Sequence, residues 1–159
     1  MQVTIRLATK NDMKDVLDLI KELAHFEKEP NEVEVTVEEL IKDGFNNNPE
    51  FICFVAEMNN NIEGMALAYK RYSTWKGVIL HLEDLIVKQE RRGSGIGTQL
   101  LDRIVMYGNE IGVKRICWEV LDWNKPAIKF YNKKGAYIKE DWRVVHLDQK
   151  GIKAYISKL

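Results

Sequence analysis

The feature that most constrains the fold is a glycine-rich link, RRGSGIG at 91–97, between a strongly apolar segment and an amphipathic one. The apolar segment predicts a long strand over 78–87, and the spacing after the link predicts a helix over 98–111 that Gly112 ends. Glycines allow the backbone to approach an anion closely, and a helix start presents unpaired amide groups. The link therefore predicts a site for a diphosphate, although a simple tight turn uses the same residues.

Two familiar phosphate-binding loops do not match this link. A Walker loop needs a lysine directly after its last glycine, but Thr98 follows Gly97. A dinucleotide loop of the form G-x-G-x-x-G beginning at Gly93 needs a third glycine, and Thr98 occupies that position. Triphosphate hydrolysis and hydride transfer are therefore disfavoured.

The remaining sequence predicts a mixed α/β (α+β) fold in one domain, 1–159, with the order β-α-α-β-β-β-α-β-α-β-β. Period-two patterns and turn residues predict strands at 2–7, 51–57, 62–70, 78–87, 115–121, 142–147 and 152–156. Capping residues and helical spacing predict further helices after Thr9 and Asp12, between Thr36 and Gly44, and between Asn124 and Gly135. The last two strands would form a hairpin around DQKG.

Charge and composition exclude several classes of partner. The 159 residues carry 24 Lys and Arg against 24 Asp and Glu, so neither nucleic acid nor an anionic membrane is expected as a partner. Cys53 and Cys117 fall inside predicted strands, which favours a reducing compartment over a disulfide framework. No apolar run resembles a signal peptide or a membrane span, and the three histidines lack ligand spacing, so we expect a cytoplasmic protein without a metal.

The link also matches R-x-x-G-x-G, beginning at Arg92, in the setting of this element order. On that pattern the sequence resembles the GNAT (Gcn5-related) N-acetyltransferase superfamily, and within it the spermidine/spermine (diamine) acetyltransferase group. Four blocks carry the resemblance: LIKELAHFE (19–27), LEDLIV (82–87), RRGSGIGTQLL (91–101) and WNKPAIKFYNKKGA (123–136). The resemblance implies a mixed, mostly antiparallel twisted sheet flanked by helices.

The resemblance further implies acetyl-CoA as co-substrate and a direct attack of an amine on the thioester. The diphosphate would lie on the backbone of Arg92, Gly93, Ser94, Gly95, Ile96, Gly97 and Thr98. The pantetheine arm would pair with the strand end formed by Leu85, Ile86 and Val87, which would also place a backbone N–H near the oxyanion. Asn124 and Tyr131 match positions near the arm and the thioester, and Tyr131 matches the acid that protonates the departing thiolate.

An amine substrate implies acidic residues around it. The candidates for amine binding are Phe26, Glu27, Trp75, Glu83, Asp84, Glu119 and Glu140. Glu83 matches the position that receives the amine proton through water, which makes it the second candidate catalytic residue. Strand alternation directs Glu83 and Asp84 to opposite faces unless a bulge intervenes. His81, two residues earlier, is predicted to be a satisfied buried residue, with a proton relay as the other possibility.

Two departures from the diamine group keep the substrate open. Phe26 stands where those enzymes carry a tyrosine, and Ser73, before Trp75, stands where they carry an acid. A thialysine-like amino acid or another small primary amine is thus an alternative to a polyamine. A peptide amine, a non-catalytic acyl-CoA-binding module and a plain anion-binding domain are the other readings. The apolar residues after 143 are expected either to complete a homodimer, as in related enzymes, or to fill a monomer core.

Overall fold

The structure is a computed structural model that describes residues 2–159 in two compact units, one ending at Glu119 and the other spanning Val120–Leu159. The first unit contains a five-stranded sheet in the order β1-β2-β3-β4-β5. The strands are β1 (Thr4–Leu7), β2 (Ile52–Met58), β3 (Asn61–Ser73), β4 (Gly77–Val87) and β5 (Ile116–Cys117). Neighbours pair antiparallel except for β4 and β5, which are parallel. The mixed, mostly antiparallel sheet expected from the sequence is confirmed.

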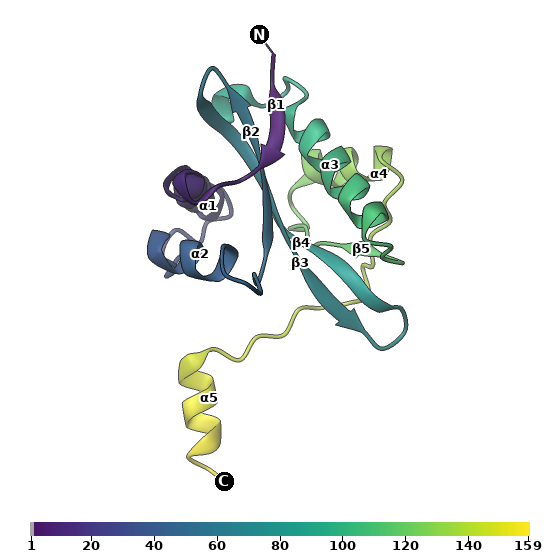
Figure 1. Cartoon of the computed structure of the whole chain (residues 1–159). Helices are drawn as coiled ribbons and strands as arrows, with labels where there is room; N and C mark the ends of the chain where they lie inside the picture. The colour runs from purple at the N-terminus through teal and green to yellow at the C-terminus, as the bar shows by residue number, and fades with distance from the viewer. Residues whose placement is uncertain (1) are drawn as a thin grey trace. The chain divides into compact units, whose positions relative to one another are not determined.

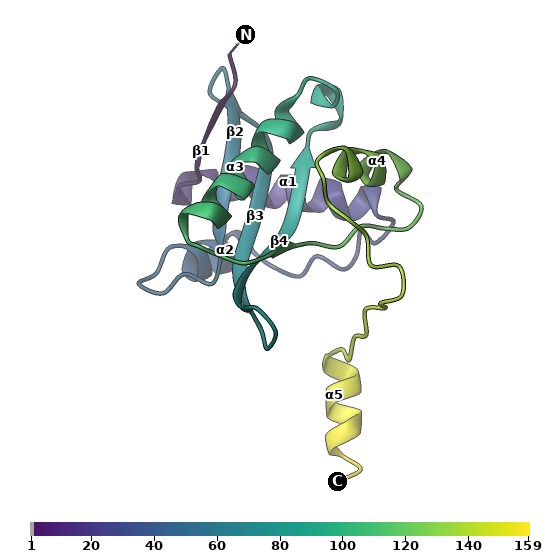
Figure 2. The ribbon, with the colours of Figure 1, turned by 90° about the vertical axis from the view of Figure 1, so that its right-hand side faces the viewer.

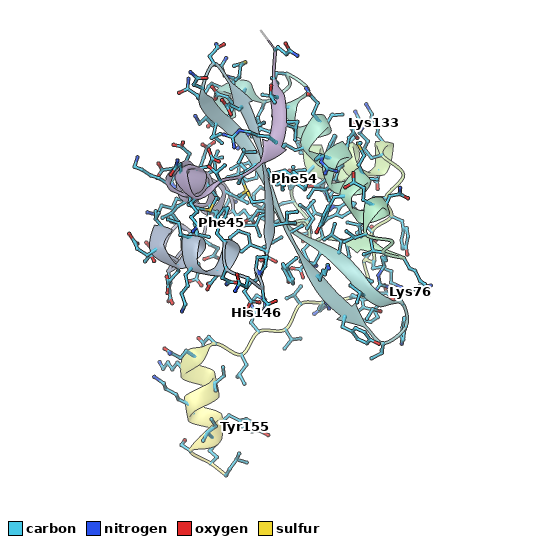
Figure 3. The ribbon with its side chains drawn as sticks, in the orientation of Figure 1. Phe45, Phe54, Lys76, Lys133, His146 and Tyr155 are labelled. Atoms are coloured by element: carbon cyan, nitrogen blue, oxygen red, sulfur yellow. The ribbon has the colours of Figure 1, made fainter. Side chains whose placement is uncertain are left out.

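Helices cover both faces of this sheet (Figures 1 and 2). One face packs against α1 (Met13–Phe26) and α2 (Val37–Gly44), whose buried side chains join Cys53, Val55 and Met65 of the sheet in one apolar cluster. The other face packs against α3 (Ile96–Glu110). There the Phe54 ring meets Tyr107 edge-on at 5.8 Å, on the α3 side of the sheet (Figure 3). Alternation along β2 thus supplies both layers of the core.

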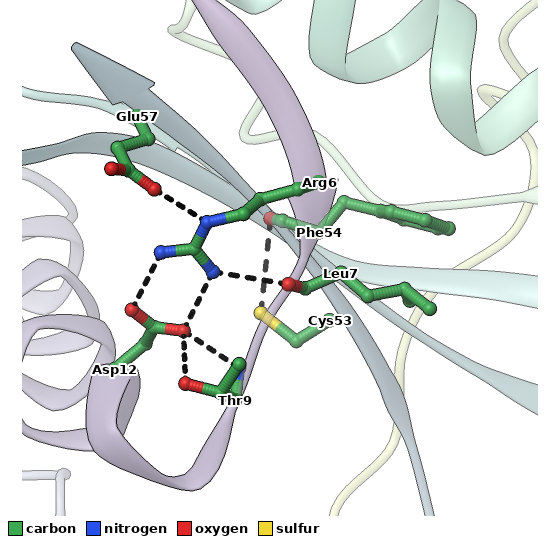
Figure 4. Close-up of polar contacts among 7 residues, drawn as sticks. All are labelled: Arg6, Leu7, Thr9, Asp12, Cys53, Phe54 and Glu57. Carbon is green, nitrogen blue, oxygen red and sulfur yellow. Dashed lines mark hydrogen bonds and ion pairs between the residues drawn. The ribbon is translucent and has the colours of Figure 1, made fainter. Parts of the chain in front are cut away.

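A polar network fixes the start of α1 to the sheet (Figure 4). Arg6 of β1 donates two hydrogen bonds to Asp12, at 2.8 and 2.9 Å, and a further one to Glu57 of β2. Asp12 ends the short 3₁₀ helix η1 (Lys10–Asp12) and also accepts from the backbone and side chain of Thr9. The predicted capping box of Thr36 and Glu39 is confirmed. Thr9 and Asp12 form a second capping box at η1, whereas the Asp12 side chain does not cap α1 as predicted.

The β2–β3 and β3–β4 pairs each contain an irregularity, and the one in β4 concerns the candidate site. Leu67 of β3 pairs with Asp84, whereas the next residue, Ala68, pairs with Leu82. Glu83 is therefore an extra residue without a partner on β3, which is a β-bulge. The bulge breaks the strict alternation that would direct Glu83 and Asp84 to opposite faces.

The second unit corrects one expectation from the sequence. It contains α4 (Lys125–Lys133) and α5 (Gln149–Ile156), and residues 142–147 form no strand, so the predicted final hairpin is wrong. Asp148 accepts a hydrogen bond from the Gly151 amide at 2.6 Å and begins a helix where the DQKG letters also suited a turn. Ile152, Tyr155 and Ile156 follow helical spacing, whereas strand alternation would place Ile152, Ala154 and Ile156 on one face.

Two smaller differences concern lengths. The predicted strand 115–121 is paired only at Ile116–Cys117, and α3 begins at Ile96 rather than Thr98. Gly112 and Gly135 end their helices with φ of 71° and 85°, as predicted. No helix within residues 2–159 is both long and apolar enough to cross a bilayer.

Candidate active site

The glycine-rich link forms an open turn between β4 and α3. After the 3₁₀ helix η2 (Gln89–Arg91), Gly93 and Gly95 adopt left-handed φ values of 80° and 87°. Gly95 is the N-cap of α3 and has no side chain to accept from the first turn. The amides of Ile96, Gly97 and Thr98 therefore have no acceptor within the helix and add to its positive dipole end. A Cβ at either left-handed glycine would meet no atom within 4 Å, so the space above the turn is open.

Side chains of α1 hold this turn from one side. Arg92 lies 5.0 Å from the Phe26 ring centre and 3.8 Å from a Glu22 carboxylate oxygen, and the Gln89 amide donates to Glu22 at 3.1 Å. Arg92 also donates to the Val87 carbonyl at 3.2 Å. Phe26, expected at the amine, thus contacts the guanidinium of the glycine turn. Behind the turn, buried Glu63 lies 3.5 Å from both Lys88 and Arg91.

The edge of β4 that faces away from β3 has no strand partner in the described part of the chain over about half its length. β5 pairs with this edge only at Leu80 and His81, and no strand of residues 2–159 pairs with it from there to Val87. The strand end Leu85–Val87 leads directly to the glycine turn. An extended amide-containing chain can pair with such an edge while its anionic end lies on the α3 amides.

Three carboxylates gather at the bulge of β4. Burial and the negative charges of Glu83 and Glu27 together raise the pKa of Asp84 to about 6, with burial the largest cause. Burial also raises the pKa of Glu27, which caps the C-terminal end of α1. Glu83 is accessible, with 52% of its side chain exposed. The bulge and the end of α1 therefore create a locally negative site that favours a cation.

A row of titratable side chains continues from this site. His81 Nε2 lies 3.4 Å from Glu83, and its Nδ1 lies 3.4 Å from Cys117 Sγ. The hydrogen bonds to Cys117 and to Glu83 raise the pKa of His81 to about 9, and the His81 hydrogen bond lowers the pKa of Glu83. Tyr69 packs its ring 5.1 Å from His81, and burial and the neighbouring Glu83 raise its pKa. His81 is buried, as predicted, and it also contacts Glu83.

Five predicted residues remain, two in the first unit and three in the second. Trp75 is 77% exposed in the β3–β4 turn, and Glu119 is exposed after β5. In the second unit, Asn124 caps α4 by accepting from the Ala127 amide at 3.3 Å. Tyr131 lies on α4 with its ring 5.3 Å from that of Phe130, and Glu140 is exposed.

Tyr69 and Cys117 were not predicted from the sequence as neighbours of His81. The sequence signal for a group of titratable side chains here was the pair His81 and Glu83, two residues apart on one strand. Which residues oppose them depends on strand register, which the local pattern does not specify.

Comparisons with known proteins agree with this geometry. Residues 15–136 match the acetyltransferase (GNAT) family, and the chain belongs to that family. Thialysine N-epsilon-acetyltransferase of Bos taurus is 39% identical over 142 residues, covering 84% of each protein. The spermidine/spermine N(1)-acetyltransferase-like protein 1 of Homo sapiens is 34% identical over 160 residues, covering 92% of this chain and 22% of that protein. The chain is thus an N-acetyltransferase that uses acetyl-CoA and acts on amines.

Solved structures show the same fold at lower identity. A Vibrio cholerae integron cassette protein superposes with a TM-score of 0.79 at 20% identity, covering 98% of both chains. An aminoglycoside acetyltransferase from a soil metagenomic sample gives a TM-score of 0.73 at 23% identity, covering 91% of this chain and 93% of the other.

Proposed function

We propose that the protein transfers the acetyl group of acetyl-CoA to a primary amine of a small diamine- or polyamine-like substrate. The observation that carries this proposal is the cluster of Glu27, Glu83 and Asp84 at the bulge of β4. Burial and mutual repulsion make ionisation of these carboxylates unfavourable, and a bound ammonium group would offset that cost. A substrate with a second amine has a further positive charge for a second carboxylate. A substrate with a single amine leaves part of the cluster uncompensated.

A thialysine-like amino acid is the second candidate. The relatives that are 39% identical carry that activity in their names, and Phe26 and Ser73 depart from the diamine pattern. Phe26 also lies against Arg92. Such a substrate presents a side-chain amine together with an α-amino and a carboxylate group.

Acetyl-CoA suits the turn and the strand edge described above. In the proposed complex its diphosphate accepts hydrogen bonds from the amides of Ile96, Gly97 and Thr98. Its pantetheine arm pairs with the free edge at Leu85–Val87, and a backbone N–H of that edge stabilises the oxyanion. Arg92, paired with Glu22 and Phe26, keeps the turn in place.

The amine must lose a proton before it attacks, because an alkylamine has a pKa near ~10.4. We propose Glu83 as the acceptor, through a water molecule, because its carboxylate is half exposed. His81 then contacts the carboxylate that receives the proton. The attack forms the amide bond and expels the coenzyme A thiolate.

We propose Tyr131 as the acid that protonates this thiolate. Its support is the matched WN-x-P-A-x-x-FY block and the cap at Asn124 that begins α4. Tyr131→Phe is expected to lower kcat at least tenfold while the Kd for acetyl-CoA stays nearly unchanged. Phe130→Leu is the matched control for packing on α4. Wild-type kcat in Tyr131→Phe would remove Tyr131 from this role.

The substrate is tested by steady-state kinetics with acetyl-CoA over diamines, polyamines, thialysine, lysine, aminoglycosides and a lysine peptide. The proposal expects the highest kcat/KM for a diamine or polyamine, and a loss in Glu83→Gln that is larger for these than for a monoamine. Preference for thialysine would select the second candidate. Preference for the peptide would contradict both.

We also propose a homodimer. Several apolar side chains of residues 142–156 are largely exposed, including Val145 at 90% and Tyr155 at 62%. Figure 3 labels Tyr155 on α5. A second copy of the chain that covers them removes this apolar area from water.

A further inference from the structure

The two cysteines of the chain differ sharply in their surroundings. Cys53 is 4% exposed in the apolar cluster beneath α1, and burial raises the pKa of its thiol to about 12. Cys117 is partly exposed and is the last paired residue of β5. Cys53 is inert for nucleophilic chemistry in the folded protein, which makes it an internal control for Cys117.

The Cys117 thiol is in contact with an imidazole that is itself held in place. Its Sγ lies 3.4 Å from His81 Nδ1. His81 is 6% exposed, its Nε2 faces Glu83 at 3.4 Å, and its ring packs against Tyr69. A thiol beside a fixed imidazole passes its proton to the ring, and the resulting thiolate is the reactive form.

The other charges near Cys117 act in the same direction. Burial raises the pKa of the thiol, but the His81 hydrogen bond and charge, together with Arg71 of β3 and Arg115 before β5, outweigh burial and lower it. Tyr69 and Glu83 contact His81, and neither supplies a positive charge to the sulfur. The cationic surroundings of the sulfur favour a thiolate and an anionic reagent over a cationic one.

The position of Cys117 couples it to the acetyl-transfer site. β4 and β5 separate directly after the pair His81 and Cys117, and the bulge with Glu83 begins two residues further along β4. We propose that Cys117 is a reversible thiol-modification site that exchanges with small anionic disulfides, and that the adduct stops acetyl transfer. The second half of this proposal rests on the proposed role of Glu83.

The exchange needs no oxidant other than the disulfide itself. The Cys117 thiolate attacks one sulfur of the disulfide, a new S–S bond forms to that half, and the other half departs as a thiolate. The proton of the thiol remains on His81. The modified sulfur no longer accepts from His81, and its substituent occupies the point where β4 and β5 part. A dithiol reductant reverses the reaction.

The test uses oxidised glutathione and intact-protein mass spectrometry on the folded wild type, Cys53→Ser, Cys117→Ser and His81→Gln. We expect one adduct in the wild type and in Cys53→Ser and none in Cys117→Ser. His81→Gln should react about tenfold more slowly at pH 7, and the difference should narrow above pH 9, where an ordinary exposed thiol ionises without the help of an imidazole. The proposed modification site is contradicted if Cys117 of the wild type reacts as slowly as Cys53. It is also contradicted if Cys117 reacts equally fast in the wild type and in His81→Gln.

Turnover is measured on the same samples. The wild-type adduct should lose most of its turnover and regain it with dithiothreitol, whereas Cys117→Ser, whatever its starting turnover, should be unaffected by the disulfide. A complete adduct with unchanged turnover overturns the regulatory half. If no amine is acetylated by the unmodified wild type, the proposed function fails, and the mass measurement still decides the thiol half.

Discussion

At the scale of single residues, the candidate site combines groups that are each unfavourable alone. Asp84 keeps a carboxylate in a mostly buried position next to two other carboxylates. A protein without a cationic ligand gains nothing from this arrangement, because burial and like charges both oppose ionisation. We therefore expect these carboxylates to lower the stability of the folded protein while they support its function.

Asp84→Asn is expected to raise stability and lower activity. Because the folded pKa is raised from 3.8 to about 6, the folded state loses stability as pH rises through this interval, by about 3 kcal/mol at most. At pH 8 the variant should have a Tm several degrees above wild type, and near pH 4 the two should coincide.

The same variant should raise the KM for the amine. Glu119→Gln, which removes an exposed carboxylate, is the control and should leave Tm unchanged. A Tm for Asp84→Asn at or below wild type at pH 8 would contradict the raised pKa. Thermal melts from pH 4 to 8, with amine kinetics at pH 8, provide both readouts.

At the scale of elements, features specified by neighbouring residues were predicted from the sequence. The capping boxes, the cap at Asn124 and the glycine turn at 93–97 depend on a few adjacent letters and are present. Non-local features were not predicted: the pairing of His81 with Cys117 depends on strand register. Residues 149–156 fit two periods at once, and the Asp148 cap favours the helix.

The Arg6–Asp12 pair should stabilise the junction between η1, α1 and the sheet. Asp12→Asn removes a bidentate charge-assisted interaction and is expected to cost about 2 kcal/mol at pH 7. The folded pKa of Asp12 is lowered from 3.8 to about 2, so its contribution is present above 3.8 and is lost as pH falls through 2. Urea unfolding should show the difference at pH 7 and not at pH 2. Asp15→Asn, an exposed change one turn further on, is the control.

The glycine turn can be tested with two matched substitutions. Gly95→Ala and Gly112→Ala both place a Cβ on a left-handed residue with no atom within 4 Å, so each carries a similar backbone strain of about 1 kcal/mol. Only Gly95 adjoins the free amides of α3. We expect Gly95→Ala to weaken acetyl-CoA binding about tenfold by calorimetry, with Gly112→Ala near wild type. Equal affinities would place the diphosphate elsewhere.

At the scale of the whole molecule, we propose that the two units form a single domain of the acetyltransferase family. Residues 15–136 match one family, and this range crosses the boundary between the units at Glu119 and Val120.

The proposed homodimer predicts a mass in solution of about twice the chain's 18.5 kDa. Val145→Lys should shift sedimentation equilibrium toward the monomer, because it introduces a charge at a 90% exposed apolar side chain that the proposed second copy covers. The substitution should leave the folding of the single chain intact, since an exposed position makes few contacts. Lys150→Glu, an exposed change on α5, is the control. A wild type that sediments as a monomer at high micromolar concentration would contradict the dimer, and the exposed side chains of 142–156 would then need another partner.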